Sequence, residues 1–206
     1  MRISCVLSAR ELLSINTDLI VFPEGICWAE IEAAQSSHPE SAIVGAIVEN
    51  RRSRGLLIYQ GLNRIDYLKV ESDNLTNGTG NLKQNPVYMF GDVCIGVLIC
   101  KDINHPAFSR AVIENIKSIS AKLKLLCVPA DMDNFNFTGE NLLYPQTYEG
   151  LHVIMCNHTK SHPQDRCKSF VTNTRGMKVR VQTHVEPIHT DLPDGKLTRT
   201  DNVGET

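Results

Sequence analysis

The stretch Val93-Cys94-Ile95-Gly96-Val97-Leu98-Ile99-Cys100-Lys101-Asp102 decides the fold of this chain. Its run of mostly apolar residues predicts a strand that is buried on both faces, as in an α/β sheet. The residues that follow, Ala107–Ser120, have the pattern of a helix. Ligands of α/β proteins bind at the carboxyl ends of strands, where Cys100 stands. A strand-to-helix turn exposes a side chain that the strand holds in place, so Cys100 is a candidate nucleophile.

Two further stretches supply the charged partners that a reactive thiol needs. Asp18–Gly25 is a short apolar run with Glu24 near its end, and Asp66–Val70 places Lys69 in a strand-like segment. Each residue has a simpler interpretation on its own. Cys100 would be a small buried side chain, Glu24 a solvated loop residue and Lys69 a snorkelling edge-strand lysine. Together, the three indicate a Glu–Lys–Cys site.

Three motifs, taken in order, resemble the signatures of the nitrilase (carbon–nitrogen hydrolase) superfamily. They are Phe22-Pro23-Glu24, Tyr67-x-Lys69 and Gly96-Val97-Leu98-Ile99-Cys100-x-Asp102. The resemblance spans about residues 12–190, with looser matches at Cys127-Val128-Pro129-Ala130, Tyr148-Glu149-Gly150, Val153-Ile154-Met155-Cys156-Asn157, Lys168-Ser169-Phe170 and Arg175-Gly176. It implies an α/β fold, a four-layer αββα sandwich of mixed sheets. It also implies catalytic roles for Glu24, Lys69 and Cys100, with the backbone N–H of Lys101 in the oxyanion hole.

The sequence departs from the superfamily pattern at three points. Lys101 stands where an aromatic residue is usual, and Glu24 and Lys69 are closer in sequence than expected. Many members also carry a second glutamate several residues after the lysine, and Glu71 is too near to match it. Lys83 is therefore a rival for the catalytic lysine. We favour Lys69, because Lys83 lies in a loop-like stretch rich in glycine and asparagine.

Composition places the chain among ordinary globular proteins. With 206 residues, 42% hydrophobic and 21% charged, it is expected to form a single domain, 1–206, in which 1–15 is atypical and 191–206 is a flexible tail. The net charge of −2 argues against nucleic acid or an anionic membrane as partner. No apolar run approaches the ~20 residues of a membrane span, and no signal peptide is visible. Seven cysteines without paired short spacings favour a reducing, cytoplasmic location.

The N-terminus does not offer the first strand that the superfamily has. A strand over Met1–Leu7 would leave only the ten residues Ser8–Thr17 before the strand at Leu19–Phe22. A parallel crossover needs about a dozen or more. The apolar stripe therefore predicts a helix over residues 3–14 and an open sheet edge. Such an edge, together with the pairing that the resemblance implies, predicts a homodimer or a part of a larger assembly.

Further elements follow from periodicity and turn residues. We predict a helix over Trp28–Ser37, hairpins of Ser41–Val48 with Leu56–Gln60 and of Val87–Phe90 with Val93–Cys100, and strands over Ile65–Val70, Leu125–Val128 and Val153–Cys156. Polar loops are predicted over Glu71–Pro86 and Asp131–Gly139, and a short helix over Asn141–Tyr148.

The predicted function is a hydrolase that cleaves a non-peptide C–N bond of a small amide or nitrile through a cysteine thioester. No metal or organic cofactor is expected, because the spacing Cys156-x-His158-x₃-His162-x₄-Cys167 matches no common zinc module. Two alternatives stay open. One is a catalytically degenerate nitrilase-like module that binds a ligand or partner. The other is a thiol enzyme in which His105 activates Cys100, which leaves Glu24 and Lys69 without a role.

Overall fold

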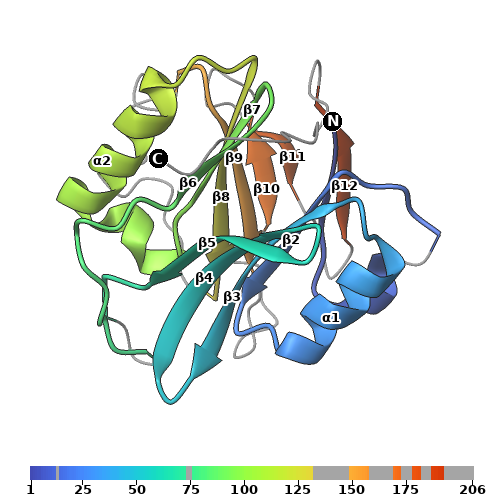
Figure 1. The fold of residues 1–206 in the computed structure, drawn as a ribbon, viewed down its shortest axis with the longest axis horizontal. Coiled ribbons are helices and arrows are strands. Elements are labelled where there is room, and N and C mark those ends of the chain that lie inside the picture. Colours follow the sequence, from blue (N-terminus) through green and yellow to red (C-terminus); the bar gives the residue numbers. More distant parts are fainter. Residues whose placement is uncertain are drawn as a thin grey trace.

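Two mixed sheets stand at the centre of the molecule, in the part of the chain that the structure describes (Figure 1). The computed structural model describes residues 1–12, 14–72, 76–131, 149–157, 169–172, 178–181 and 187–192. The first sheet has the order β12-β1-β2-β3-β4-β5, and the second has the order β11-β10-β9-β8-β7-β6. The strands are β1 (Arg2–Cys5), β2 (Leu19–Glu24), β3 (Ala42–Glu49), β4 (Arg52–Tyr59), β5 (Leu62–Leu68), β6 (Val87–Phe90), β7 (Val93–Val97), β8 (Leu123–Ala130), β9 (His152–Asn157), β10 (Phe170–Thr172), β11 (Lys178–Val181) and β12 (Ile188–Asp191). The helices are α1 (Trp28–Ser37) and α2 (Pro106–Ser118), with short 3-10 turns η1 (Ala9–Leu12) and η2 (Cys100–Asn104).

Strand β2 shows how the layers are stacked. Its side chains alternate: Leu19 and Val21 join the core that includes the second sheet, whereas Ile20 and Phe22 pack with α1 and η1. Helix α2 covers the other face of the second sheet, and the two helices lie on opposite sides of the molecule in Figure 1. The order helix, sheet, sheet, helix confirms the predicted αββα sandwich.

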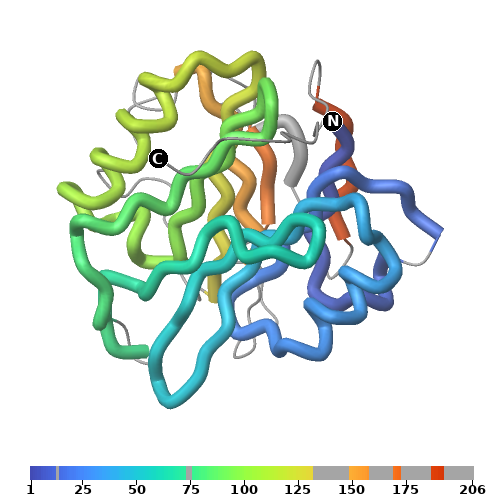
Figure 2. The backbone as a smooth tube through the Cα atoms, viewed as in Figure 1, coloured from blue at the N-terminus to red at the C-terminus, as the bar shows by residue number. Residues whose placement is uncertain are grey.

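The N-terminal prediction is wrong, because residues 2–5 form a strand. Strand β1 pairs in parallel with β2 on one side and antiparallel with β12 on the other. Since β1 ends at Cys5, residues 6–18 remain for the crossover to β2, and thirteen residues meet the minimum of about a dozen. Figure 2 shows β12, in red, beside the blue N-terminal strand. The open sheet edge was one of the two grounds for the homodimer prediction, and β12 covers it. The prediction now rests on the resemblance alone.

The predicted hairpins are confirmed, with small shifts at their ends. Strands β3 and β4 pair through Glu49↔Arg52, so only Asn50 and Arg51 form the turn. Both have positive φ, 49° and 60°, as a type I′ turn requires. The β6–β7 hairpin turns at Gly91, as predicted, and strand β7 stops at Val97. Helix α1 has the predicted bounds.

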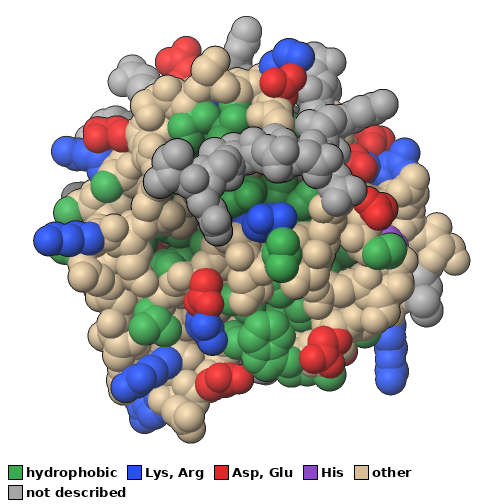
Figure 3. Space-filling model, in the orientation of Figure 1, with side chains coloured by type: hydrophobic (Ala, Val, Ile, Leu, Met, Phe, Trp, Pro, Cys, Tyr) green, Lys and Arg blue, Asp and Glu red, His purple; other side chains and the backbone are tan. Residues whose placement is uncertain are grey.

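Several predicted features lie outside the described residues. They are the helix over Asn141–Tyr148, most of the loop over Asp131–Gly139, and the residues His158, His162, Cys167, Lys168, Arg175 and Gly176. Strands β10 and β11 do pair antiparallel, where the resemblance places a closing hairpin. Among the described residues, no helix is long and apolar enough to cross a membrane. Acidic and basic side chains are interspersed on the face seen in Figure 3.

Candidate active site

Glu24 is the last residue of β2, and its side chain is only 4% exposed. Two neighbours in the sequence explain how it is presented. Pro23 has no N–H for the sheet ladder, and the pairing of β2 with β3 shifts register between Val21 and Glu24. Gly25 then takes a φ of 84°, a conformation that glycine adopts without strain, and turns the chain out of the sheet. The carboxylate therefore stands at the carboxyl end of a buried strand.

Lys69 lies one residue beyond the end of β5, and its side chain is fully buried. Its ammonium nitrogen Nζ contacts both carboxylate oxygens of Glu24, Oε1 at 2.8 Å and Oε2 at 3.1 Å. The structure thus brings these two predicted residues together as a buried ion pair. A buried charge persists only with a partner, so the simpler interpretation of Lys69 as a snorkelling edge residue is wrong.

Cys100 begins η2, three residues after strand β7. Its φ of +45° lies in the left-handed region, which is strained for a residue with a side chain. Such strain at a strand-to-helix turn is typical of a positioned nucleophile. The thiol is 1% exposed and points to the end of β8, where the carbonyl oxygen of Asp131 lies 3.9 Å from Sγ.

Burial and charge keep the Cys100 thiol protonated at rest. Burial raises its pKa most, and the carboxylate of Glu24, which also interacts with the thiol by a hydrogen bond, raises it further. The ammonium of Lys69 lowers the pKa, but its effect is smaller than the first two. Glu24, Lys69 and Cys100 therefore form one electrostatic cluster, and a base must take the thiol proton before the sulfur can attack.

The rival residues lie elsewhere. Lys83 is exposed. His105 caps helix α2, where its Nδ1 accepts a hydrogen bond from the N–H of Phe108 at 3.2 Å. Cys156 is buried in β9 and donates from Sγ to the carbonyl oxygen of Val6 at 3.6 Å. In the described ranges no three His, Cys, Asp or Glu side chains lie close enough to hold a metal ion.

Two further residues, Tyr67 and Asp102, are buried against the cluster. Both fall within the three motifs, but the motifs alone indicate no role for them. Alternation along a strand could have indicated Tyr67, because residues two apart, such as Tyr67 and Lys69, share a face. No sequence pattern indicated the burial of Asp102, which depends on contacts with residues 67–71.

The solved structures that superpose on this chain include amidases. The amidase from Nesterenkonia sp. AN1 superposes with a TM-score of 0.65 at 19% identity, covering 94% of this chain and 93% of that one. The chain has the nitrilase-superfamily fold. A structure of a mutant of the same amidase, described as showing Michael addition of acrylamide at its active-site cysteine, gives a TM-score of 0.65 at 18% identity, covering 94% and 93%.

A third neighbour is a cysteine-to-alanine mutant of the same amidase, described as a complex with butyramide. It gives a TM-score of 0.63 at 18% identity, covering 94% of this chain and 91% of that one. A scan against models of known protein families finds no match, and a search of curated proteins finds no significant relative. The nitrilase-superfamily fold is therefore established by structure and not by sequence similarity.

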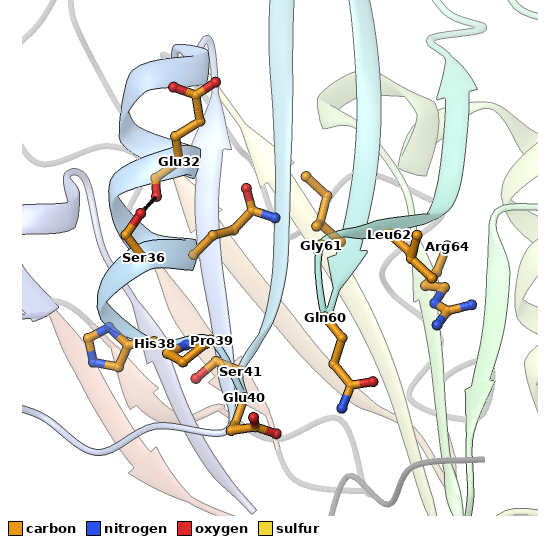
Figure 4. A pocket seen from close by; sticks show the side chains of 12 residues that line it. Glu32, Ser36, His38, Pro39, Glu40, Ser41, Gln60, Gly61, Leu62 and Arg64 are labelled. Atoms are coloured by element: carbon orange, nitrogen blue, oxygen red, sulfur yellow. Dashed lines mark hydrogen bonds between the residues drawn. The ribbon is translucent and has the colours of Figure 1, made fainter. Parts of the chain in front are cut away.

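A surface cavity lies away from this cluster. It has a volume of about 800 Å³ and lies between α1 and the β4–β5 turn (Figure 4). Its lining is mixed, with charged side chains such as Glu32 and Arg64 around Ile58. A second cavity of about 720 Å³ lies near Arg54 and Asp66. Neither is lined by Glu24, Lys69 or Cys100, although Tyr67 and Leu68, which directly precede Lys69, line the second.

Proposed function

We propose that this chain is a carbon–nitrogen hydrolase that cleaves a small amide through a covalent thioester on Cys100. The observation that carries the proposal is the buried Glu24–Lys69 ion pair beside a buried thiol in a strained turn. The amidases that share the fold support this reaction class. A small nitrile is a possible second substrate, because the same sulfur attack on its carbon gives a thioimidate.

Glu24 acts as the general base in the first step. The thiol is neutral at rest, so its proton passes to the Glu24 carboxylate as the sulfur attacks the amide carbon. The new C–S bond forms while the carbonyl π electrons move to the oxygen. The product is a tetrahedral oxyanion attached to Cys100.

Lys69 and the N–H of Lys101 stabilise this oxyanion. The Lys69 ammonium already stands beside Glu24, and Lys101 directly follows the nucleophile at the start of η2. Loss of one oxyanion donor typically costs about 3–4 kcal/mol of transition-state stabilisation. Both groups are fixed before substrate binds, so little reorganisation accompanies the reaction.

The leaving amine departs with the proton that Glu24 holds. The C–N bond breaks as the oxyanion collapses, which releases ammonia from a primary amide and leaves a thioester on Cys100. Glu24 is again a carboxylate and takes a proton from a water molecule. The oxygen of that water attacks the thioester carbon in the same step. Collapse of the second oxyanion breaks the C–S bond, and the acid leaves as the thiol regains its proton.

A closed site favours a small substrate. Glu24, Lys69 and Cys100 are each 4% exposed or less, so a bulky amide has little room beside the sulfur. The Nesterenkonia amidase is described in complexes with butyramide and acrylamide. We therefore propose short primary aliphatic amides as the substrate class.

Ammonia release from butyramide tests the proposal. Wild-type protein should release ammonia, and Cys100→Ala should abolish the release. Cys94→Ala is the matched control, since it removes another buried thiol from β7, the strand that precedes Cys100, and should keep activity. Mass spectrometry after incubation with acrylamide should locate one adduct on Cys100. Equal turnover in wild type and Cys100→Ala would refute the mechanism.

A missing first strand would favour the binding-module alternative, but β1 is present. The atypical Lys101 and the unmatched second glutamate still favour it. If butyramide raises the melting temperature of the wild type but no ammonia is released, the result supports the binding module over the hydrolase.

A further inference from the structure

Asp102 is a fully buried carboxylate that the proposed mechanism does not use. It lies two residues after Cys100, within η2. Its Oδ1 and Oδ2 accept from the N–H of Val70 at 3.0 and 3.2 Å, and Oδ1 also accepts from the N–H of Glu71 at 2.7 Å. These are the two peptide groups that directly follow Lys69. One side chain of the nucleophile segment thus holds the backbone of the lysine segment.

Tyr67 makes a second link between the same two segments. Its buried hydroxyl donates to the Asp102 carboxylate and accepts a hydrogen bond from the N–H of Ile99. Gly55 on β4 makes room for the ring, because a Cβ there would lie 2.5 Å from a ring carbon of Tyr67. The segment that contains Lys69 is therefore linked to the segment that contains Cys100 on both sides of Lys69, through Tyr67 before it and through Val70 and Glu71 after it. The link from Tyr67 reaches Ile99, directly before Cys100.

Lys69 needs this support because it lies beyond the sheet ladder of β5. Its N–H donates to the carbonyl oxygen of Ser53 at 2.9 Å. Its carbonyl oxygen accepts from the N–H groups of Thr79 at 3.0 Å and Gly80 at 2.9 Å. A Cβ on Gly80 would lie 2.0 Å from the carbonyl oxygen of Leu68, so only glycine permits this approach. The backbone at Lys69 is therefore held by hydrogen bonds from Thr79 and Gly80, which we call the glycine loop, and the next two residues are held by Asp102.

Charge also connects Asp102 to the cluster. Burial raises the pKa of Asp102 to about 6, while the two backbone N–H donors, Lys69 and Tyr67 act in the opposite direction. The charged and titratable groups that face it are Lys69 and Tyr67 from the end of β5. Glu24 from β2 and Cys100 from η2 complete the neighbouring cluster. Protonation of Asp102 near pH 6 therefore weakens both hydrogen bonds to the lysine segment and removes a negative charge near Lys69.

We propose that Asp102 is the positioning residue that holds Lys69 against Glu24 and Cys100, by joining the nucleophile turn to the lysine segment through its ionised carboxylate. This inference rests on the proposed hydrolase function. Asp102 does not touch the reacting atoms. It sets where the ammonium stands when the oxyanion forms, so its loss affects kcat more than KM.

Asp102→Asn is the decisive variant, because it keeps the shape and removes the charge. The single amide oxygen can still accept at the position of Oδ1, but the NH₂ group at the position of Oδ2 then faces the N–H of Val70, whose nitrogen lies 3.2 Å from Oδ2. With butyramide as substrate, kcat should fall 10- to 100-fold and KM should change less than threefold. The wild-type pH profile of kcat should show an acid limb with a midpoint near 6, and this limb should be absent from Asp102→Asn. Asp92→Asn, at an exposed ion pair with Lys122, is the matched control and should leave both unchanged.

Hydrogen–deuterium exchange gives a readout that does not depend on turnover. Peptides that contain Val70 and Glu71 should exchange at least tenfold faster in Asp102→Asn than in wild type, and Asp92→Asn should exchange as wild type does. Unchanged exchange at these residues, or an unchanged kcat and acid limb, overturns the positioning role. A wild type that is inactive on every amide, with faster exchange in Asp102→Asn, refutes the hydrolase proposal and supports the Asp102 link alone.

Discussion

Replacing Lys69 by methionine tests the energetics of the buried ion pair. Methionine keeps the aliphatic stem, so the substitution removes the ammonium without opening a large cavity. The Glu24 carboxylate, 4% exposed and previously 2.8 Å from Nζ, then loses its partner where water does not reach it. Breaking a buried pair in this way costs about 3–5 kcal/mol. That is a large share of the roughly 5–15 kcal/mol that stabilises a typical domain.

The double variant separates lost attraction from an unpaired charge. Glu24→Met should cost about as much as Lys69→Met, because it removes the carboxylate that lies 2.8 Å from the buried ammonium. Glu24→Met/Lys69→Met buries no charge, so it should be less destabilised than either single variant. Urea unfolding at pH 7 measures all three, and Lys83→Met, at an exposed lysine, should lie within about 0.5 kcal/mol of wild type.

The double variant also provides an internal check. The loss of unfolding free energy in the double variant could instead equal the sum of the losses in the two single variants, within about 0.5 kcal/mol. Such additivity would show that the two charges do not interact. That result would refute the ion pair as a unit.

Three more outcomes are expected, together with one on assembly. Glu24→Gln and Lys69→Met should each lower kcat on butyramide at least a hundredfold, measured as ammonia release. The pKa of Asp102 is raised from its ordinary value of 3.8 to about 6, so the folded state favours the protonated form of this carboxyl group. The resulting stabilisation is fully present below pH 3.8 and is lost as pH rises through 6. Unfolding measurements across this range should show a loss of about 3 kcal/mol. Gly96→Ala would place a Cβ 2.4 Å from Cδ1 of Ile116 and should cost about 1–3 kcal/mol, partly recovered by Ile116→Val. Sedimentation should show a homodimer, and a clean monomer at high concentration would contradict that prediction.

Local patterns predicted most of the described elements. Helix α1 was predicted with its observed bounds, because the turn at His38-Pro39 ends it clearly. The β6–β7 hairpin and its turn at Gly91 also follow from local sequence. The error at residues 3–14 arose because a four-residue strand offers too short a pattern to outweigh a helical stripe. Its identity depends on pairing with β2 and with β12, and β12 lies at the far end of the described chain.

The residues of the candidate site could be predicted from the sequence, but the contacts that hold them in place could not. Motif order indicated Glu24, Lys69 and Cys100, and the structure brings all three together; their catalytic roles remain a proposal. Lys69 was predicted within a strand, whereas it follows β5 and depends on the glycine loop and on Asp102. These contacts join residues ten or more positions apart. No local pattern contains them.

The pairing of β1 with β12 has a consequence for synthesis of the chain. Strand β1 is made first, but its outer neighbour includes Ile188 and is made more than 180 residues later. At about 5–20 residues per second, the ribosome needs roughly 10–40 s to supply that neighbour. During this time the backbone groups on one side of β1 have no strand to pair with, and such an edge can recruit another nascent chain. The first sheet is therefore completed late, and misassembly during translation should be greatest when elongation is slow between β2 and β12.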